Sequence, residues 1–183
     1  IMVVNPSFPA KSVAEFIALA KKEPGKYSFG SGSSSSRMAG ELLQQMADIK
    51  LLHVPYKSNT LAVTDLLGGQ INMMITDTAT GLPQVKAGKL RALGFSSSTR
   101  SALAPDVPTI AEAGVKGYEM GYWFAAYAPA KTPPAVVKRL NELLVKAAKS
   151  EAAKTGFYDP SGTEVFIPSP PITTRVPTSR STA

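Results

Sequence analysis

Short apolar runs alternate with amphipathic segments over the first half of the chain. The runs have the length of strands, and the segments between them place apolar residues three or four positions apart, which predicts helices. Strands that alternate with helices form parallel sheets covered on both faces, so this half predicts an α/β lobe. The expected strands are residues 1–4, 27–29, 51–54, 71–76 and 90–95, and the expected helices are 13–23, 38–47, 60–67 and 80–86.

The pattern changes after Pro105. A capping box at 109–112 predicts a short helix that Gly114 closes. Residues 118–127 are aromatic and indicate an extended segment, and a long amphipathic helix is expected at 135–149, where proline precedes its first turn. The last stretch, 160–183, is rich in proline, serine and threonine and has no apolar period, so we expect an irregular or disordered tail.

The serine-rich run after the strand at 27–29 is the most informative segment for function. It contains only glycine and serine, and a helical pattern follows it. A helix N-terminus exposes backbone N–H groups and the positive end of the helix dipole, so it can accept an anion. Five serines are more than one helix cap needs. The run therefore predicts reversible binding of a carboxylate or phosphate by Ser31, Gly32, Ser33, Ser34, Ser35 and Ser36.

Other candidate contacts follow the next two strands. Ligands of parallel α/β sheets bind at the carboxyl ends of the strands, which places the loops 55–59 and 77–80 beside the serine run. Tyr56 could line the cleft, and Asp77 could accept a hydrogen bond from a hydroxylated or amino-bearing ligand, with Thr78 next to it. The alternative for Asp77 is an Asx turn or a helix cap.

Two further side chains have competing interpretations. Arg37, directly after the serines, could form a bidentate pair with a ligand carboxylate, or it could point to solvent from the first turn of the helix. His53 is the one histidine of the chain and lies on a predicted strand. A structural role is the more common outcome for such a residue, and without a second histidine or a cysteine nearby we expect no metal site.

Composition narrows the class of protein. The chain of 183 residues has 20 basic and 13 acidic residues, a net charge of +7 that suits an anionic ligand. The basic residues are scattered, with no basic run beyond Lys21-Lys22, so we expect no nucleic acid partner.

Cysteine is absent, which excludes disulfides and thiolate chemistry, and no apolar run is long enough to span a bilayer. No signal peptide is visible at the strand-like start, so we expect a fragment or a processed product.

An enzymatic function is disfavoured by the absence of catalytic motifs. A serine nucleophile needs a base within hydrogen-bond reach and a third group that orients the base. The chain has neither a G-x-S-x-G elbow nor a phosphate-binding G-x-x-x-x-G-K-[ST] loop, and it has no paired carboxylates. We expect a binding protein without catalytic residues, metal or cofactor.

Several motifs in order resemble one family. The motifs are KYSFGSGSSSSR at 26–37, HVPYK at 53–57, DLLGGQ at 65–70, KAGKLRAL at 86–93 and PDVPTIAEAG at 105–114. Over about residues 1–155 the chain resembles the substrate-binding proteins of tripartite tricarboxylate transporters, the TctC or Bug family. The resemblance implies a periplasmic receptor of the type II "Venus flytrap" fold, which captures a small organic carboxylate between two α/β domains and delivers it to membrane permease subunits.

The resemblance also implies how the chain is divided. Residues 1–120 would be the second domain of the family, 121–159 the crossover and return helix of the other lobe, and 160–183 the tail. The first domain would be missing, so we expect an incomplete member that binds ligand weakly and can associate with itself through uncovered apolar surface.

Arg37 stands where the family often has histidine after a longer glycine loop. The aromatic residues Tyr56, Tyr122 and Trp123 slightly favour an aromatic acid as ligand. The alternative is the ligand-sensing domain of a LysR-type transcription regulator, which has a similar two-lobed fold.

Overall fold

The computed structural model describes residues 1–121 and 126–159. The chain divides into two compact units, Ile1–Trp123 and Phe124–Ala183, and each is described by itself. The predicted tail at 160–183, together with Tyr122 and Trp123, lies outside the described residues. The domain boundaries expected from the sequence stay predictions.

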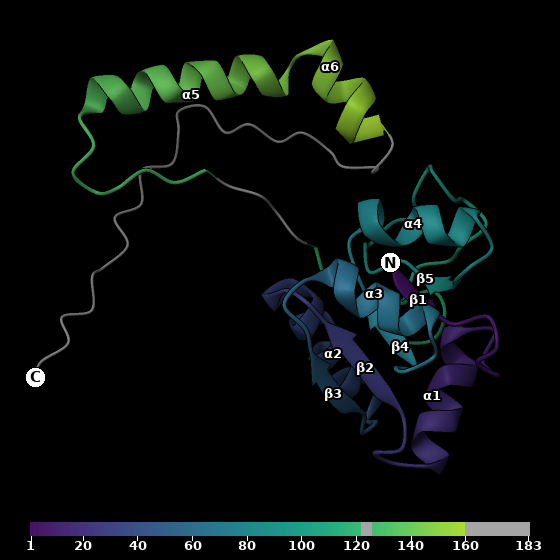
Figure 1. Cartoon of the computed structure of the whole chain (residues 1–183). Helices are drawn as coiled ribbons and strands as arrows, with labels where there is room; N and C mark the ends of the chain where they lie inside the picture. The colour runs from purple at the N-terminus through teal and green to yellow at the C-terminus, as the bar shows by residue number, and fades with distance from the viewer. Residues whose placement is uncertain (122–125, 160–183) are drawn as a thin grey trace, which may run out of the picture. The chain divides into compact units, whose positions relative to one another are not determined.

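The first unit is built on one five-stranded sheet with the strand order β3-β2-β4-β1-β5 (Figure 1). The strands are β1 (Met2–Val4), β2 (Ser28–Ser31), β3 (Leu52–Pro55), β4 (Met73–Ile75) and β5 (Arg91–Gly94). Strand β2 pairs in parallel with β3 and with β4, whereas β1 is antiparallel to both of its neighbours, β4 and β5. The predicted parallel sheet is confirmed for β2, β3 and β4, whereas β1 runs antiparallel to its neighbours. A strand buried on both faces has the same apolar pattern in either direction, so the sequence could not reveal its orientation.

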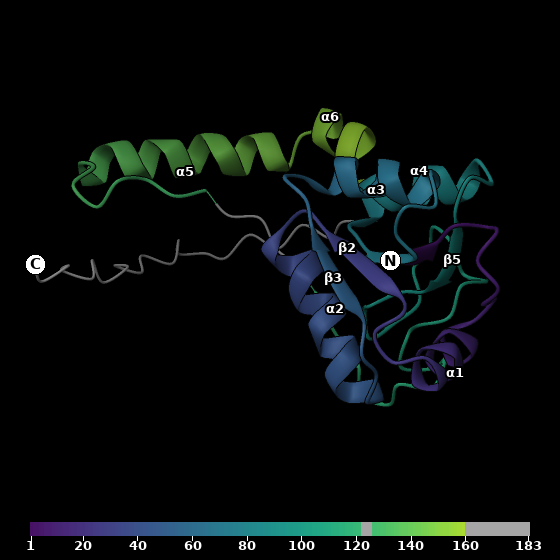
Figure 2. The same cartoon turned by 60° about the horizontal axis from the view of Figure 1, so that its bottom comes forward.

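Helices cover both faces of this sheet, as the sequence predicted (Figure 2). They are α1 (Val13–Lys22), α2 (Ser34–Ala47), α3 (Asn59–Leu67) and α4 (Thr78–Lys86). Residues of α1 and α2 form one apolar cluster with Met2 and Val4, while residues of α3 and α4 form a second cluster with Val3. Because neighbouring residues of a strand point to opposite faces, the three residues of β1 contribute to both cores.

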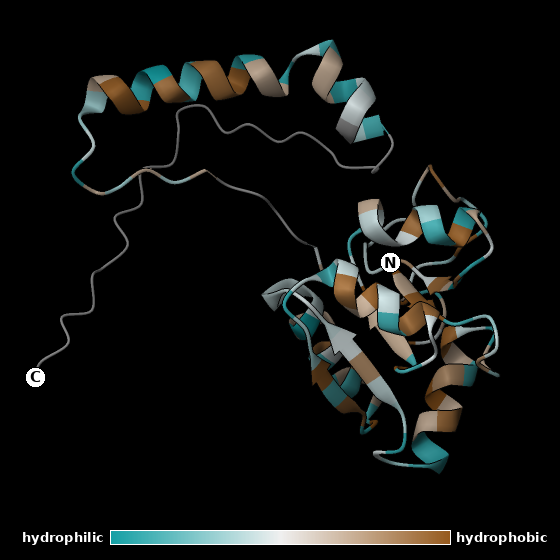
Figure 3. Cartoon of the chain, viewed as in Figure 1, coloured by the Kyte–Doolittle hydropathy of each residue, from teal (hydrophilic) through white to brown (hydrophobic). Residues whose placement is uncertain are grey.

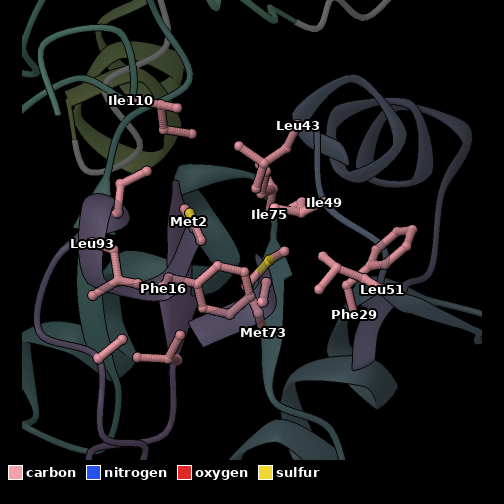
Figure 4. Close-up of a cluster of buried hydrophobic side chains, with 14 of the residues drawn as sticks. Met2, Phe16, Phe29, Leu43, Ile49, Leu51, Met73, Ile75, Leu93 and Ile110 are labelled. Carbon is pink, nitrogen blue, oxygen red and sulfur yellow. The ribbon is translucent and has the colours of Figure 1, made fainter. Parts of the chain in front are cut away.

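The core between the sheet and α1 and α2 is closely packed. Figure 4 shows the side chains of Met2, Phe16 and Met73 converging on one space, and all three are fully buried. Each buried side chain of this size stabilises the fold by about 1.5–3 kcal/mol relative to an exposed one. This core holds β2 and β4 in place, and with them the loops that follow their carboxyl ends.

The largest differences from the predicted elements are the start of one helix and the absence of another. Helix α2 begins at Ser34 rather than Met38, because Ser33 caps it and the following serines form its first turn. The predicted short helix after Thr109 is wrong. Its capping bonds form, with the Thr109 N–H donating to Glu112 at 2.8 Å and the Glu112 N–H donating to Thr109 at 3.1 Å, but the segment remains a series of turns. Gly114 follows too soon, with φ at +121°, for a helix to propagate.

The second unit contains the predicted long helix, α5 (Pro134–Ala148), followed by α6 (Glu151–Ala153) and the π-helical turn η1 (Lys154–Tyr158). No residue of α5 is buried in the described part of the chain. Its apolar residues alternate with polar ones along the helix (Figure 3), and the exposed apolar side chains are Val136, Leu140, Leu143 and Leu144.

The described part of the expected aromatic segment, 118–121, contains no strand, although Tyr118 is buried against α2. Among the described residues no helix is both long and apolar enough to cross a membrane.

Candidate functional site

The carboxyl ends of three neighbouring strands carry the predicted binding loops. Because β3, β2 and β4 are parallel neighbours, the connections that follow them leave the same edge of the sheet. Each connection leads within a few residues into a helix, so α2, α3 and α4 begin at this edge with Ser34, Asn59 and Thr78. Three helix N-termini, each with free N–H groups and a partial positive charge, therefore lie at one edge.

Ser33 and Ser36 cap the start of α2 with a reciprocal pair of hydrogen bonds. The Ser33 hydroxyl accepts from the Ser36 N–H at 3.2 Å, and the buried Ser36 hydroxyl accepts from the Ser33 N–H at 3.1 Å. The N–H groups of Ser34 and Ser35 occupy the first two helical positions, where no partner exists within the helix. These two groups, with the hydroxyls of exposed Ser33 and Ser34 and half-buried Ser35, are the donors that the turn offers to a ligand.

Gly32 brings the turn before α2 directly against the start of α3. A side chain at this position would overlap the backbone of Ser58 and Asn59. The absence of a Cβ is therefore required for the close approach of the two turns. The atoms that lie against Gly32 belong to the protein itself, and contact of Gly32 with a ligand stays a prediction.

The side chain of Asn59 joins the starts of all three helices. Its Oδ1 accepts from the Gly32 N–H and from the Ser36 hydroxyl, both at 3.1 Å, and its Nδ2 donates to Asp77 Oδ2 at 3.0 Å. The sequence placed Asn59 in an expected site loop but gave no reason to select it. The available signal was an amide side chain at the first position of a helix that follows a strand, from where it can bond to neighbouring turns.

Asp77 uses both carboxylate oxygens within the protein. As the N-cap of α4, its Oδ1 accepts from the Thr80 N–H at 2.8 Å and from the Thr80 hydroxyl at 2.6 Å, while Oδ2 accepts from Asn59 and from Thr76 at 3.3 Å. Partial burial disfavours the charged form, but these hydrogen bonds outweigh it and hold the pKa of Asp77 below its ordinary value. The helix-cap alternative is confirmed, and ligand contact by Asp77 stays a prediction.

Tyr56 and Thr78 lie at the same edge with different surroundings. The Tyr56 hydroxyl donates to Asp65 Oδ2 at 2.8 Å, and its ring packs on the apolar cluster of α3 and α4. Burial and this hydrogen bond raise the pKa of Tyr56 to about 12. Thr78 is half-buried at the first position of α4. Contact of either residue with a ligand stays a prediction.

Arg37 lies on the exposed side of α2. Its Nε is 3.8 Å from Glu41 Oε1, one helical turn later, and its side chain is 62% exposed. This is the solvent-facing position that the sequence left open as the alternative. Contact of Arg37 with a ligand carboxylate, which would replace or add to the pairing with Glu41, stays a prediction.

Ser31 contacts the one histidine of the chain. The Ser31 hydroxyl, at the carboxyl end of β2, lies 2.7 Å from His53 Nε2 on β3, and Ser31 is buried. The His53 ring also lies against Phe29, with centroids 4.8 Å apart. A serine-histidine contact occurs in nucleophilic sites, but there a third group orients the imidazole. Within residues 1–121 and 126–159 His53 has no hydrogen bond to a carboxylate, and no cluster of three or more metal-binding side chains is present.

Residues 1–176 match the family described as the tripartite tricarboxylate transporter family receptor, TctC. The chain belongs to this TctC family. Its members are receptors, which bind their ligands and are not enzymes. The resemblance inferred from the sequence is confirmed, and the alternative of a LysR-type regulator is not favoured.

The TctC chain is similar to other proteins in sequence and, for solved relatives, also in fold. A Pseudomonas sp. (strain P51) protein, described as a UPF0065 protein in the tcbD-tcbE intergenic region, is 39% identical over 150 residues, which are 80% of this chain and 45% of the relative. An R. palustris protein solved with adipate has 30% identity and a TM-score of 0.83, and MatC from Rhodopseudomonas palustris with bound malate has 26% identity and a TM-score of 0.84. Each alignment covers 88% of this chain and 55% of the solved chain.

The TctC chain thus spans about half the length of the relatives that it matches. The mixed, mostly parallel α/β sheet agrees with the periplasmic binding protein fold that the sequence predicted. The edge at which α2, α3 and α4 begin is the candidate ligand-binding edge of this TctC chain.

Proposed function

We propose that this chain is the ligand-binding α/β lobe of an extracytoplasmic receptor that captures a small organic carboxylate. The observation that carries the proposal is the set of free N–H groups at the start of α2, next to two further helix N-termini. The family match supports it, because TctC members are receptors of tripartite tricarboxylate transporters. The ligand would be bound and released unchanged.

One carboxylate group of the ligand would be held at the start of α2. In this mechanism the N–H groups of Ser34 and Ser35 donate to the two carboxylate oxygens, and the exposed hydroxyls of the turn add further donors. Hydrogen bonds to a charged group contribute about 1.5–3 kcal/mol each. The loss of translational and rotational freedom on association costs about 4–15 kcal/mol, which is as large as the gain from two such bonds or larger. The chain by itself should therefore bind a carboxylate weakly, with millimolar affinity or worse.

A small aliphatic dicarboxylate is the ligand class that we favour. Adipate and malate are the ligands named for two solved relatives, and both have two carboxylate groups on a short aliphatic chain. The aromatic alternative depended partly on Tyr56, whose hydroxyl is already bonded to Asp65. The other two aromatic residues invoked for it lie outside the described residues.

The partners would be membrane permease subunits, with the receptor working in the periplasm. The family match supports both proposals. A second copy of the chain is a further proposed partner, because α5 has an uncovered apolar stripe. We propose no catalytic residue, metal or cofactor.

The proposal is tested by changing the helix start without changing the helix. Ser34→Pro removes one backbone N–H at the first helical position, where proline fits and Ser33 already has the extended conformation that a residue before proline prefers. Ser34→Ala is the matched control, because it removes only the hydroxyl. Malate and adipate are titrated into each protein, and binding is followed by the NMR shifts of backbone N–H groups.

The titrations show whether the backbone N–H of Ser34 or its hydroxyl holds the carboxylate. Wild-type shifts should centre on Ser34 and Ser35, and Ser34→Pro should weaken binding about tenfold, as expected for a lost bond worth about 1.4 kcal/mol. Ser34→Ala should bind nearly as well as wild type. If neither acid, nor citrate nor benzoate, shifts the signals of a folded wild-type chain at tens of millimolar, the receptor proposal fails.

A further inference from the structure

The strongest unexplained feature of the edge is that one side chain bonds to parts of all three helix starts. Asn59 accepts one hydrogen bond from Gly32 before α2 and one from Ser36 in the first turn of α2, and it donates one to the cap of α4, while its own backbone begins α3. The orientation of its amide follows from its partners. The Gly32 N–H can only donate and the ionised carboxylate of Asp77 can only accept, so Oδ1 must face Gly32 and Nδ2 must face Asp77.

These contacts decide which donors remain for a ligand. The Gly32 N–H is consumed by Asn59 and Ser36, and the Ser36 hydroxyl is consumed by the cap and by Asn59. The backbone N–H groups that remain are those of Ser34 and Ser35, which no bond of the cap uses. Their position depends on the turn that Asn59 fixes.

The packing supports the same arrangement independently of the hydrogen bonds. The backbone of Gly32 lies so close to Ser58 and Asn59 that no side chain could fit between them. The turn before α2 therefore cannot shift toward α3, and the Asn59 amide prevents it from moving away. Asp77 in turn is fixed by Thr80 and Thr76, so the start of α4 acts as the rigid end of the connection.

We propose that Asn59 is a positioning residue that sets the start of α2 relative to α4 and so holds the Ser34 and Ser35 N–H groups in place for a carboxylate. It does not touch the ligand. That the ligand is a carboxylate rests on the proposed function. The coupling of the three helix starts can be measured without any ligand.

The main variant is Asn59→Ala, and Asn72→Ala is its matched control. Asn72 is also a half-buried asparagine that joins two strands, since its Oδ1 accepts from the Ser28 N–H at 2.8 Å. It lies just before β4 and bonds to the first residue of β2, at the opposite edge of the sheet. Both variants lose a comparable structural asparagine, so both should lower the melting temperature. Only Asn59→Ala should weaken the binding of malate and adipate, by about tenfold, which corresponds to about 1.4 kcal/mol.

A second variant gives a readout that a purely structural role would not change. In Asn59→Asp a carboxylate replaces the amide and faces Asp77, the one ionisable side chain that Asn59 bonds to in the described structure. Two adjacent carboxylates cannot both stay charged without cost, so one binds a proton more readily. The protonated form can donate to Asp77 and accept from Gly32, as asparagine does. Relative to wild type at the same pH, binding by Asn59→Asp should therefore recover as the pH falls from about 7 to about 5, while Asn59→Ala should show no recovery.

The unliganded proteins separate this proposal from the proposed function. Amide hydrogen exchange at Gly32 and Thr80 should accelerate in Asn59→Ala and stay unchanged in Asn72→Ala. If wild type binds none of the acids, the receptor proposal fails, and the exchange rates alone decide whether Asn59 couples the helix starts. Unchanged exchange at both amides in Asn59→Ala would overturn the coupling. A loss of binding no greater than in Asn72→Ala, or no recovery of Asn59→Asp at lower pH, would overturn the positioning role.

Discussion

The hydroxyl of Ser31 lies 2.7 Å from His53 Nε2, which joins the last residue of β2 to the strand beside it. Ser31 is buried, and this is its one side-chain hydrogen bond in the described structure. The contact therefore indicates a structural role for the Ser31 hydroxyl at the candidate edge, and ligand contact by Ser31 stays a prediction.

Replacing Ser31 should accordingly affect stability more than binding. Ser31→Ala should lower the free energy of unfolding by about 0.5–1.5 kcal/mol, the typical net value of one hydrogen bond. Affinity for malate should change less than twofold. Chemical denaturation and an NMR titration give the two values. A large loss of affinity with unchanged stability would instead assign the Ser31 hydroxyl to the ligand, as the sequence first suggested.

Gly32→Ala should be among the most damaging single substitutions in the first unit. The added methyl group would overlap backbone atoms of Ser58 and Asn59, which cannot rotate away as a side chain can. Overpacking typically costs about 1–3 kcal/mol, and backbone overlap places this variant at the upper end or beyond. Gly68→Ala is the control, because φ there is −77° and the nearest atoms lie at an ordinary 3.6 Å. Equal stability of the two variants in thermal unfolding would contradict the close approach of the two turns.

The sequence predicted the five strands and the four helices that cover the sheet because most of the apolar runs are buried between two helical layers. It also predicted a serine-capped helix start after β2, since serine caps and glycine have local causes, whereas anion binding there stays a prediction. Two features could not be predicted. The orientation of β1 depends on its neighbours in the sheet rather than on its own pattern. The role of Asn59 depends on three turns that are far apart in the sequence and meet only at one edge of the folded sheet.

The stability of the candidate edge should depend on pH through Asp77. Its pKa is lowered in the folded state, so the stabilisation that it contributes is present above the unfolded pKa of about 3.9 and is lost as the pH falls through the folded value. Asp77→Asn keeps a cap oxygen but removes the charge and the acceptor that Asn59 and Thr76 use, so it should cost about 1–3 kcal/mol at neutral pH. The difference in unfolding free energy between wild type and this variant should shrink as the pH falls below about 4. A difference that is the same at neutral and acidic pH would show that the charge of Asp77 contributes nothing.

The exposed stripe of α5 should make the chain associate with itself. Leu140 and Leu144 are 45% and 51% exposed and lie one helical turn apart, so they share a face that water would otherwise surround. Leu140→Glu combined with Leu144→Glu places two charges on that face and should shift sedimentation velocity profiles from a concentration-dependent mixture to a monomer. Lys138→Glu with Lys146→Glu is the control, because it also adds two acidic side chains to α5 but replaces residues outside the stripe. If wild type sediments as a monomer at all concentrations, the stripe does not mediate self-association. If the control dissociates the assembly as fully as the leucine variant, the association depends on charge rather than on the apolar face.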